Sequence, residues 1–136
     1  MTIAEIQNEI IDEFDMFDDW EEKYQYMIDL GKSLPLIDPI YKTDENIILG
    51  CQSKVWLRGA TSESKVTFTA DSDAIITKGI IAILIRVFSN QKSADILEAD
   101  MTFIDKIGLK EHLSATRANG LLSMIKQIMY ALAFSN

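Results

Sequence analysis

The stretch IITKGIIAILIRVF, residues 75–88, decides how the centre of this chain folds. Its many isoleucines favour a β-strand by intrinsic propensity. However, apolar residues recur at the spacing i, i+1, i+4 and i+5 throughout the stretch, and this spacing is helical. Because the remaining face is also largely apolar, we expect the most buried helix of the protein here. Ser72 or Asp73 is the expected N-cap of this helix.

Two further helices are predicted before this stretch. Thr2 and Glu5 form a capping-box pattern ahead of apolar residues at three- and four-residue spacing, which predicts an amphipathic opening helix. A second start signal, rich in acidic residues, predicts a helix over about residues 19–30, with Gly31 as its C-terminal cap. Two prolines then interrupt regular structure, so residues 34–45 are expected to form a connector on the surface.

The pattern changes to short β-type runs after residue 46. Residues 59–64 have the composition of a hairpin turn, and residues 50–53 form a break between the first two runs. Farther along, residues 93–112 are typical of short helical pieces, and about residues 116–133 have the spacing of a closing helix. We therefore expect an α+β fold in one domain, residues 1–136, with a small antiparallel sheet of about three strands packed against several helices. The three predicted strands are residues 47–49, 55–58 and 65–70.

Composition and charge exclude several classes of function. The chain has 136 residues, of which 48% are hydrophobic and 25% charged, which is typical of a globular protein. Its net charge of -8 argues against nucleic-acid binding, because phosphates require a basic surface. The acidity lies in residues 1–45, which hold 13 acidic and 3 basic side chains. No apolar run is long enough to span a bilayer. These features predict a cytoplasmic protein that binds neither nucleic acid nor membrane.

Cys51 is the only cysteine of the chain, which limits the chemistry that it can support. One thiol can form neither an intramolecular disulfide nor a zinc or iron–sulfur site with several thiolates, so no metal site is expected. Gly50 precedes it, and glycine permits the backbone angles that hold a side chain at the tip of a tight loop. Lys54 and Arg58 follow without an intervening acid, and positive surroundings favour the reactive thiolate. The alternative is that Cys51 is a buried, inert hydrophobe.

Other candidate residues give weaker indications. His112, the only histidine, could act as a base for a Cys51 nucleophile. No third group that would orient the pair can be identified, and the role of His112 stays open. Trp20 is followed at helical spacing by Tyr24 and Met27, which is more typical of a core than of a ligand site. Three acid pairs lie at predicted helix starts, where the helix dipole favours anions, and helix capping is the better explanation for most of them: Asp18 with Asp19, Glu21 with Glu22, and Asp71 with Asp73.

Four motifs together resemble the SufE family of sulfur-acceptor proteins, the partners of cysteine desulfurases in iron–sulfur cluster assembly. They are WEEKYQYMIDLGKSLP at residues 20–35, GCQSKVW at 50–56, DSDAIITKG at 71–79 and HLSATRANGL at 112–121. The resemblance implies an α+β fold with a short, curved antiparallel sheet covered by helices, shared with the cluster-scaffold proteins. It also implies that Cys51 is the catalytic, persulfide-accepting residue. Ala115 departs from the proline that the family often has at this position. Residues for loop support or partner docking would be Gly50, Gln52, Ser53, Asp73, Lys78 and Arg117.

The function implied by this resemblance is that of a sulfur carrier. A cysteine desulfurase that uses pyridoxal phosphate would pass sulfane sulfur to Cys51, and the carrier would stimulate the desulfurase and deliver sulfur to an iron–sulfur scaffold complex. The carrier itself would be an accessory protein with no cofactor, and not an enzyme. Two alternatives stay open: a paralogue that supplies a different acceptor, and a regulatory or adaptor domain with an inert Cys51. The oligomeric state, including a homodimer, and the identity of the desulfurase also stay open.

Overall fold

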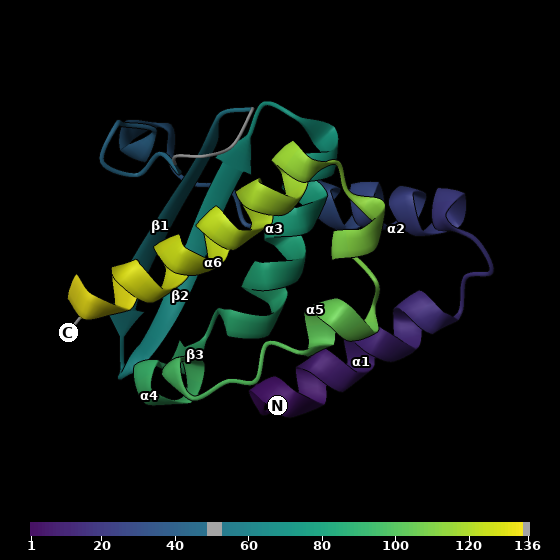
Figure 1. Cartoon of the computed structure of the whole chain (residues 1–136). Helices are drawn as coiled ribbons and strands as arrows, with labels where there is room; N and C mark the ends of the chain where they lie inside the picture. Colours follow the sequence, from purple (N-terminus) through teal and green to yellow (C-terminus); the bar gives the residue numbers. More distant parts are fainter. Residues whose placement is uncertain (49–52, 135–136) are drawn as a thin grey trace.

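The computed structural model of the chain describes residues 1–48 and 53–134 and has the expected α+β architecture (Figure 1). A three-stranded antiparallel sheet has the strand order β1-β2-β3. Helix α3 contacts β2, α1, α2 and α6, and α6 also packs against β1, so α3 lies at the centre of the fold. The elements in chain order are α1 (Ile3–Asp15), α2 (Trp20–Lys32), η1 (Pro39–Tyr41), β1 (Val55–Ser62), β2 (Lys65–Ser72), α3 (Ile75–Phe88), β3 (Gln91–Lys92), α4 (Ser93–Leu97), α5 (Phe103–Lys106), η2 (Lys110–His112) and α6 (Ala115–Phe134).

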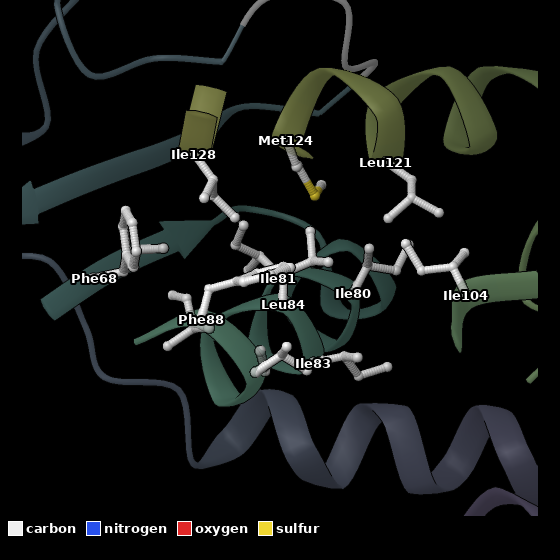
Figure 2. Close-up of a cluster of buried hydrophobic side chains, with 14 of the residues drawn as sticks. Phe68, Ile80, Ile81, Ile83, Leu84, Phe88, Ile104, Leu121, Met124 and Ile128 are labelled. Carbon is white, nitrogen blue, oxygen red and sulfur yellow. The ribbon is translucent and has the colours of Figure 1, made fainter. Parts of the chain in front are cut away.

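The predicted central helix is confirmed, and α3 has the predicted bounds of residues 75–88. Its side chains are buried on most faces, as the apolar composition indicated. Figure 2 shows these side chains meeting Phe68 from the sheet and Met124 and Ile128 from α6. Each of these three partners is at most 1% exposed. The periodicity of the stretch therefore outweighs the β-propensity of its isoleucines, because the helix buries its apolar side chains against both the sheet and α6.

The predicted N-cap of α3 is wrong. Ala74 occupies the cap position, and no side chain forms the usual cap hydrogen bond. The Ser72 hydroxyl instead accepts a bond from the Ala74 N–H at 3.2 Å. Asp73 is used elsewhere, since its carboxylate accepts a hydrogen bond from the Lys54 N–H at 3.0 Å. A long-range contact thus takes the residue that the local pattern assigned to the helix.

The first two helices begin as predicted, but the second ends later. Thr2 and Glu5 form a complete capping box, and the Asp19 side chain caps α2. Gly31 was expected to cap α2, and this prediction is wrong. The helix continues through Lys32, and Gly31 is a buried residue within it.

Gly31 is needed at the contact between α2 and α3. A Cβ atom added to it would lie 3.0 Å from the Gly79 nitrogen on α3. On the other side of the contact, a Cβ atom added to Gly79 would lie only 2.8 Å from the Met27 carbonyl carbon and still closer to its oxygen. Two glycines therefore allow the backbones of the two helices to approach more closely than any side chain would permit. We call this contact of Met27, Gly31 and Gly79 the glycine seam.

Strands β1 and β2 form one hairpin that is longer than predicted. Residues 59–64 were expected to form the turn, but the first four of them continue β1. Glu63 and Ser64 alone make the turn, with φ angles of 52° and 71°. Positive φ at both central residues is typical of a two-residue hairpin turn. Gly59 lies within the strand, where an added Cβ atom would approach Phe68 Cε1 to 3.0 Å.

The third strand differs from the prediction. Residues 47–49 were expected to form a strand, but Ile47 makes only an isolated bridge to Trp56, and Leu49 lies outside the described residues. Strand β3 instead follows α3 and pairs with the start of β2. The expected short helical pieces over residues 93–112 and the closing helix are confirmed. Within residues 1–48 and 53–134, no helix combines the length and hydrophobicity needed to cross a membrane.

A charged cluster connects α1 to α3. Arg86 on α3 contacts Glu9 at 3.0 Å and Glu13 at 2.5 Å, and the Tyr26 hydroxyl also donates to the Glu13 carboxylate. Hydrogen bonds from Arg86, aided by Tyr26, lower the pKa of Glu13 against the opposing effect of burial. Burial, together with the bond to Glu13, raises the pKa of Tyr26 to about 12. Because the cluster keeps Glu13 ionised, it stabilises the packing of α1.

Candidate functional site

The candidate site is built around the single thiol of the chain. Cys51 and the predicted support residues Gly50 and Gln52 lie outside the described residues. The structure does describe the backbone on each side of them. Upstream, the Ile48 N–H donates to the Val55 carbonyl at 2.8 Å. Residues 46–48 thus run beside the outer edge of β1 and bring the chain to the site from the sheet.

Downstream of the thiol, Lys54 is held by residues that lie almost twenty positions later in the chain. We call Asp71 and Ser72 at the end of β2, together with Asp73 before α3, the 71–73 clasp. The Asp73 carboxylate accepts from the Lys54 N–H at 3.0 Å. The Lys54 carbonyl accepts from the Ser72 hydroxyl at 2.9 Å and from the Asp73 N–H at 3.2 Å. Both backbone groups of Lys54 are therefore satisfied by the clasp, and of the two roles predicted for Asp73 the geometry supports loop support.

Asp71, the first residue of the clasp, holds the upstream connector. Its carboxylate contacts Lys42 at 2.6 Å and Lys78 at 3.3 Å. Burial alone would raise the pKa of Asp71, but hydrogen bonds from Lys42, the Ser72 N–H and Lys78 outweigh it and hold the pKa below its usual value. The Lys42 ammonium also lies 5.3 Å from the centre of the Trp56 ring. Asp71 thus links the connector to α3 through its two lysine partners, and Lys42 also contacts β1 at Trp56.

Asp71 belongs to one of the acid pairs that the sequence placed at helix starts, but it does not cap α3. Asp71 lies on β2 directly opposite Trp56, and strand alternation places its side chain on the opposite face from Ser72. A linear pattern reveals neither lysine partner of Asp71, because Lys42 precedes it by 29 residues and Lys78 follows it by seven residues on a different element. In the sequence, a role of Asp71 on the strand was indicated only by the order Asp71, Ser72, Asp73 directly after the predicted strand, because alternating residues of a strand face opposite sides.

A small cavity opens beside Ser53. Its volume is about 170 Å³, and α3, α6 and Ser53 form its walls. The Ser53 and Thr77 hydroxyl oxygens are 3.1 Å apart and share a hydrogen bond. Arg117 lies at the cavity on the first turn of α6, where its N–H donates to the Ser114 hydroxyl at 3.2 Å. The lining residues are Ser53, Ala74, Thr77, Ile80, Thr116, Arg117, Gly120 and Met124.

The structure brings together only some of the predicted support residues. Ser53 and Arg117 share the cavity, whereas Lys78 lies on another flank of α3 with Asp71 and beside a second hollow. Thr77 was not predicted. Its position among apolar residues in the helical pattern concealed it, although a hydroxyl residue inside so apolar a helix was a usable signal.

His112 forms a separate cluster with the start of α2. Its ring stacks on Trp20 with centroids 4.0 Å apart and planes inclined by 12°. Its Nδ1 atom lies 3.1 Å from the Gly108 carbonyl oxygen, and the Tyr24 hydroxyl donates to the His112 carbonyl. These contacts attach η2, and through it the start of α6, to α2. The structure thus gives His112 a structural role, while its pairing with Cys51 stays untested.

The donor set of the described residues does not suggest a metal centre. Within residues 1–48 and 53–134, no group of three or more His, Cys, Asp or Glu side chains is arranged to hold a metal ion. The acids near the site, Asp71 and Asp73, are engaged by lysine and backbone donors.

The chain matches a protein-family model described as SufE, Fe-S metabolism associated domain, over residues 8–132. The chain belongs to the SufE family. This confirms the resemblance that the four sequence motifs carried. Among curated proteins, an uncharacterized SufE-like protein of Rhizobium meliloti (strain 1021) is 44% identical over 126 residues, covering 89% of this chain and 90% of that protein. Another from Rhizobium etli is 43% identical and is covered to 85% of its length.

Two further similarities extend this result. SufE-like protein 1, chloroplastic/mitochondrial, of Arabidopsis thaliana is 38% identical over 119 residues, which are 87% of this chain but 32% of that protein. A solved structure, the solution structure of a hypothetical protein from Thermus thermophilus, superposes with a TM-score of 0.80 and covers 96% of this chain and 95% of its own. At 16% identity it supports the fold alone. The SufE family membership ties the chain to Fe–S metabolism.

Proposed function

We propose that this SufE-family protein is a sulfur carrier that accepts sulfane sulfur on Cys51 from a cysteine desulfurase and delivers it for iron–sulfur cluster assembly. The observation that carries the proposal is the conjunction of family and thiol: a chain of a family associated with Fe–S metabolism has one cysteine, within GCQSKVW. Several thiolates would be needed to hold a cluster, so one cysteine favours a carrier over a scaffold. The clasp supports the proposal because it fixes the backbone three residues after the thiol.

The transfer is an exchange of one sulfur–sulfur bond for another. The Cys51 thiolate attacks the outer sulfur of a persulfide on the desulfurase cysteine. A bond forms between that sulfur and Cys51 as the bond to the desulfurase cysteine breaks, and the desulfurase cysteine leaves as a thiolate. The proton released by Cys51 is taken up by the leaving thiolate through solvent. The transferred sulfur keeps its oxidation state, so neither an oxidant nor a reductant is consumed.

This chain contributes charge and position to the exchange. Lys54 is exposed beside the site, and a cation near a thiol favours the thiolate that performs the attack. The hydrogen bonds of the clasp hold the Lys54 backbone, three residues after the thiol in the sequence. In this proposal the carrier needs no cofactor of its own, because the pyridoxal phosphate belongs to the desulfurase. By removing sulfur from the desulfurase, the carrier raises the turnover of that enzyme.

The test is the variant Cys51→Ser, incubated with a cysteine desulfurase and cysteine. Serine has nearly the size of cysteine, so the fold should lose at most about 1 kcal/mol of stability. Mass spectrometry should show one added sulfur atom on the parent and none on the variant, and the variant should not stimulate cysteine turnover. A matched control places a thiol elsewhere: Cys51→Ser combined with Ser62→Cys, an exposed position at the end of β1, should also remain inactive.

The same experiment separates the rival functions. If the folded Cys51→Ser variant stimulates the desulfurase as strongly as the parent, Cys51 is not the acceptor and an adaptor function replaces the carrier. If the parent accepts sulfur but does not pass it to an iron–sulfur scaffold complex, the protein is a paralogue that supplies another acceptor. Sulfur labelled in the cysteine substrate distinguishes these destinations.

A further inference from the structure

The first turn of α3 lies between two hollows of similar size. On one flank is the cavity of about 170 Å³ beside Ser53 and Thr77. On the other flank, a hollow of about 160 Å³ lies between α2 and α3. We call the second one the α2–α3 hollow. It is lined by Ile28, Gly31, Lys32, Ile75 and Lys78.

The α2–α3 hollow lies beside the glycine seam. Gly31 belongs to both, because it lines the hollow and also lies at the close contact of the two helices. The walls are mainly hydrocarbon, because two isoleucines face the space and the two lysines border it with their methylene stems. Ile75 is 64% exposed at its edge. A hollow lined in this way is favourable for an apolar group and unfavourable for an ordered water.

The position of Ile75 relates the hollow to the site. Ile75 is two residues after Asp73, whose carboxylate binds the N–H of Lys54, the third residue after Cys51. A partner that exchanges sulfur with Cys51 must contact the protein around this point. A standard interface covers about 800 Å² on each partner, equivalent to a disc of about 16 Å radius. An interface of this size that covers Lys54 and Asp73 therefore also covers the first turn of α3.

We propose that Ile75 and the α2–α3 hollow form a docking point for one apolar side chain of the cysteine desulfurase. This inference rests on the proposed function and specifies the surface by which the partner binds. A volume of about 160 Å³ is close to that of a cavity that holds one benzene molecule, so it fits a leucine, methionine or phenylalanine side chain. An apolar anchor in a pocket with a polar rim is the arrangement that concentrates binding energy in protein interfaces. Lys32 and Lys78 provide that rim.

Two exposed aliphatic residues make a matched pair for the test. Leu97 on α4 is 60% exposed, nearly the same as Ile75. Leu97 lies far from Ile75 (Figure 1). Helix α4 follows β3, and β3 pairs with the first residues of β2, whereas α3 begins after the last residue of β2. The variants are Ile75→Asp, Ile75→Leu and Leu97→Asp. Aspartate at the first residue of α3 is compatible with the helix dipole, so Ile75→Asp should fold, as a thermal melt would verify.

The experiment measures the dissociation constant for the desulfurase by calorimetry, and the carrier concentration that gives half-maximal stimulation. Ile75→Asp should raise both about tenfold, while sulfur loading of Cys51 at saturating carrier stays at the parental level. Ile75→Leu and Leu97→Asp should match the parent. The proposal is overturned if Ile75→Asp binds like the parent, or if Leu97→Asp weakens binding equally. The parent arm reports on the proposed function: a parent that takes no sulfur rejects the carrier and this surface together, whereas a loaded parent with an unaffected Ile75→Asp rejects only the surface.

Discussion

The glycine seam and the 71–73 clasp hold neighbouring parts of the molecule by opposite means. At the seam, Gly31 and Gly79 bring two helix backbones together with no polar side chain involved. At the clasp, Asp73 and Ser72 hold Lys54 through three hydrogen bonds, and Asp71 adds two ion pairs. Close packing fails when a single methyl group is added, whereas hydrogen bonds near the surface each contribute only about 1 kcal/mol.

This difference suits the proposed work of the two regions. The seam carries α3, to which the clasp is attached, so it must keep its geometry. In the proposed function, the clasp holds a segment whose thiol meets the thiol of a desulfurase. A few exchangeable hydrogen bonds can be remade during docking at little free-energy cost, and a packed helix contact cannot.

The comparison predicts its largest effect for Gly79→Ala. The new Cβ atom would clash with the Met27 carbonyl group, 2.8 Å from its carbon, and this group cannot move without shifting α2. We expect the free energy of unfolding to fall by about 3 kcal/mol or more, although alanine is otherwise the better helix former. Urea denaturation measures this loss. Gly31→Ala is the graded control, since its Cβ atom has contacts of 3.0 Å and longer and should cost less. Equal stability of the parent and Gly79→Ala would show that the seam is not tightly packed.

The Arg86 cluster is a polar contact like the clasp, but it lies between two helices, α1 and α3. Its removal tests whether a polar contact in that position also contributes little to stability. Arg86→Met should lower the free energy of unfolding by about 1 to 2 kcal/mol, because Glu13 and Tyr26 lose their shared partner while partly buried. The pKa of Glu13 is lower in the folded chain than its usual 4.5, so the cluster stabilises the fold above that pH. This contribution is lost as the pH falls through the folded pKa. In Arg86→Met, the free energy of unfolding should therefore fall less steeply as the pH drops below about 4.5, which urea denaturation at several pH values measures. If the pH dependence is the same as in the parent, other carboxylates cause the loss of stability in acid.

Asp73→Ala should have a small global effect and a clear local one. It removes one acceptor from the Lys54 N–H, so we expect a loss of about 1 kcal/mol or less in global stability. Hydrogen exchange at the Lys54 amide should accelerate, as measured by nuclear magnetic resonance. Asp73→Asn keeps an acceptor oxygen and should retain most of the protection. If the Lys54 amide exchanges at the parental rate in Asp73→Ala, the clasp does not hold this residue.

The smallest effect is expected for the ion pairs of Asp71. The side chains of Lys42 and Lys78 are about one-third exposed, so solvent screens their attraction and each pair is worth about 0.5 kcal/mol. Because the pKa of Asp71 is lowered in the fold, this stabilisation is present above the usual carboxyl pKa of 3.8 and disappears at lower pH. Asp71→Asn should weaken the salt dependence of thermal stability at neutral pH. Identical salt dependence in parent and variant would contradict the assignment.

Sequence reasoning succeeded where local pattern and tertiary packing agree. The spacing from Ile75 to Phe88 predicted α3 with its bounds, because the same apolar faces that define the period are buried. The capping box at Thr2 predicted the start of α1, since a cap is formed by residues three apart. For the site, the motifs predicted the family, which is now shown, and named Ser53 and Arg117, which share one cavity.

Sequence reasoning failed where a residue serves a distant contact. Gly31 was predicted at a helix end and Gly59 in a turn. Instead, Gly31 allows the close approach of Gly79, and Gly59 allows that of the Phe68 ring. Asp71 and Asp73 have the pattern of caps, but their partners are far away in the sequence. No local signal distinguishes these cases, because the same residue type satisfies both needs.

The tight turn of Glu63 and Ser64 is a position where the protein can be modified far from the clasp. The turn lies at the opposite end of β2 from the clasp, and a strand of eight residues is about 25 Å long. Both residues have left-handed backbone angles that asparagine and glycine adopt more readily. Replacing the pair by Asn-Gly should therefore make the protein more heat-resistant without a change near the clasp. The same tip is a suitable place to attach a fluorophore for testing in real time whether the protein binds a cysteine desulfurase.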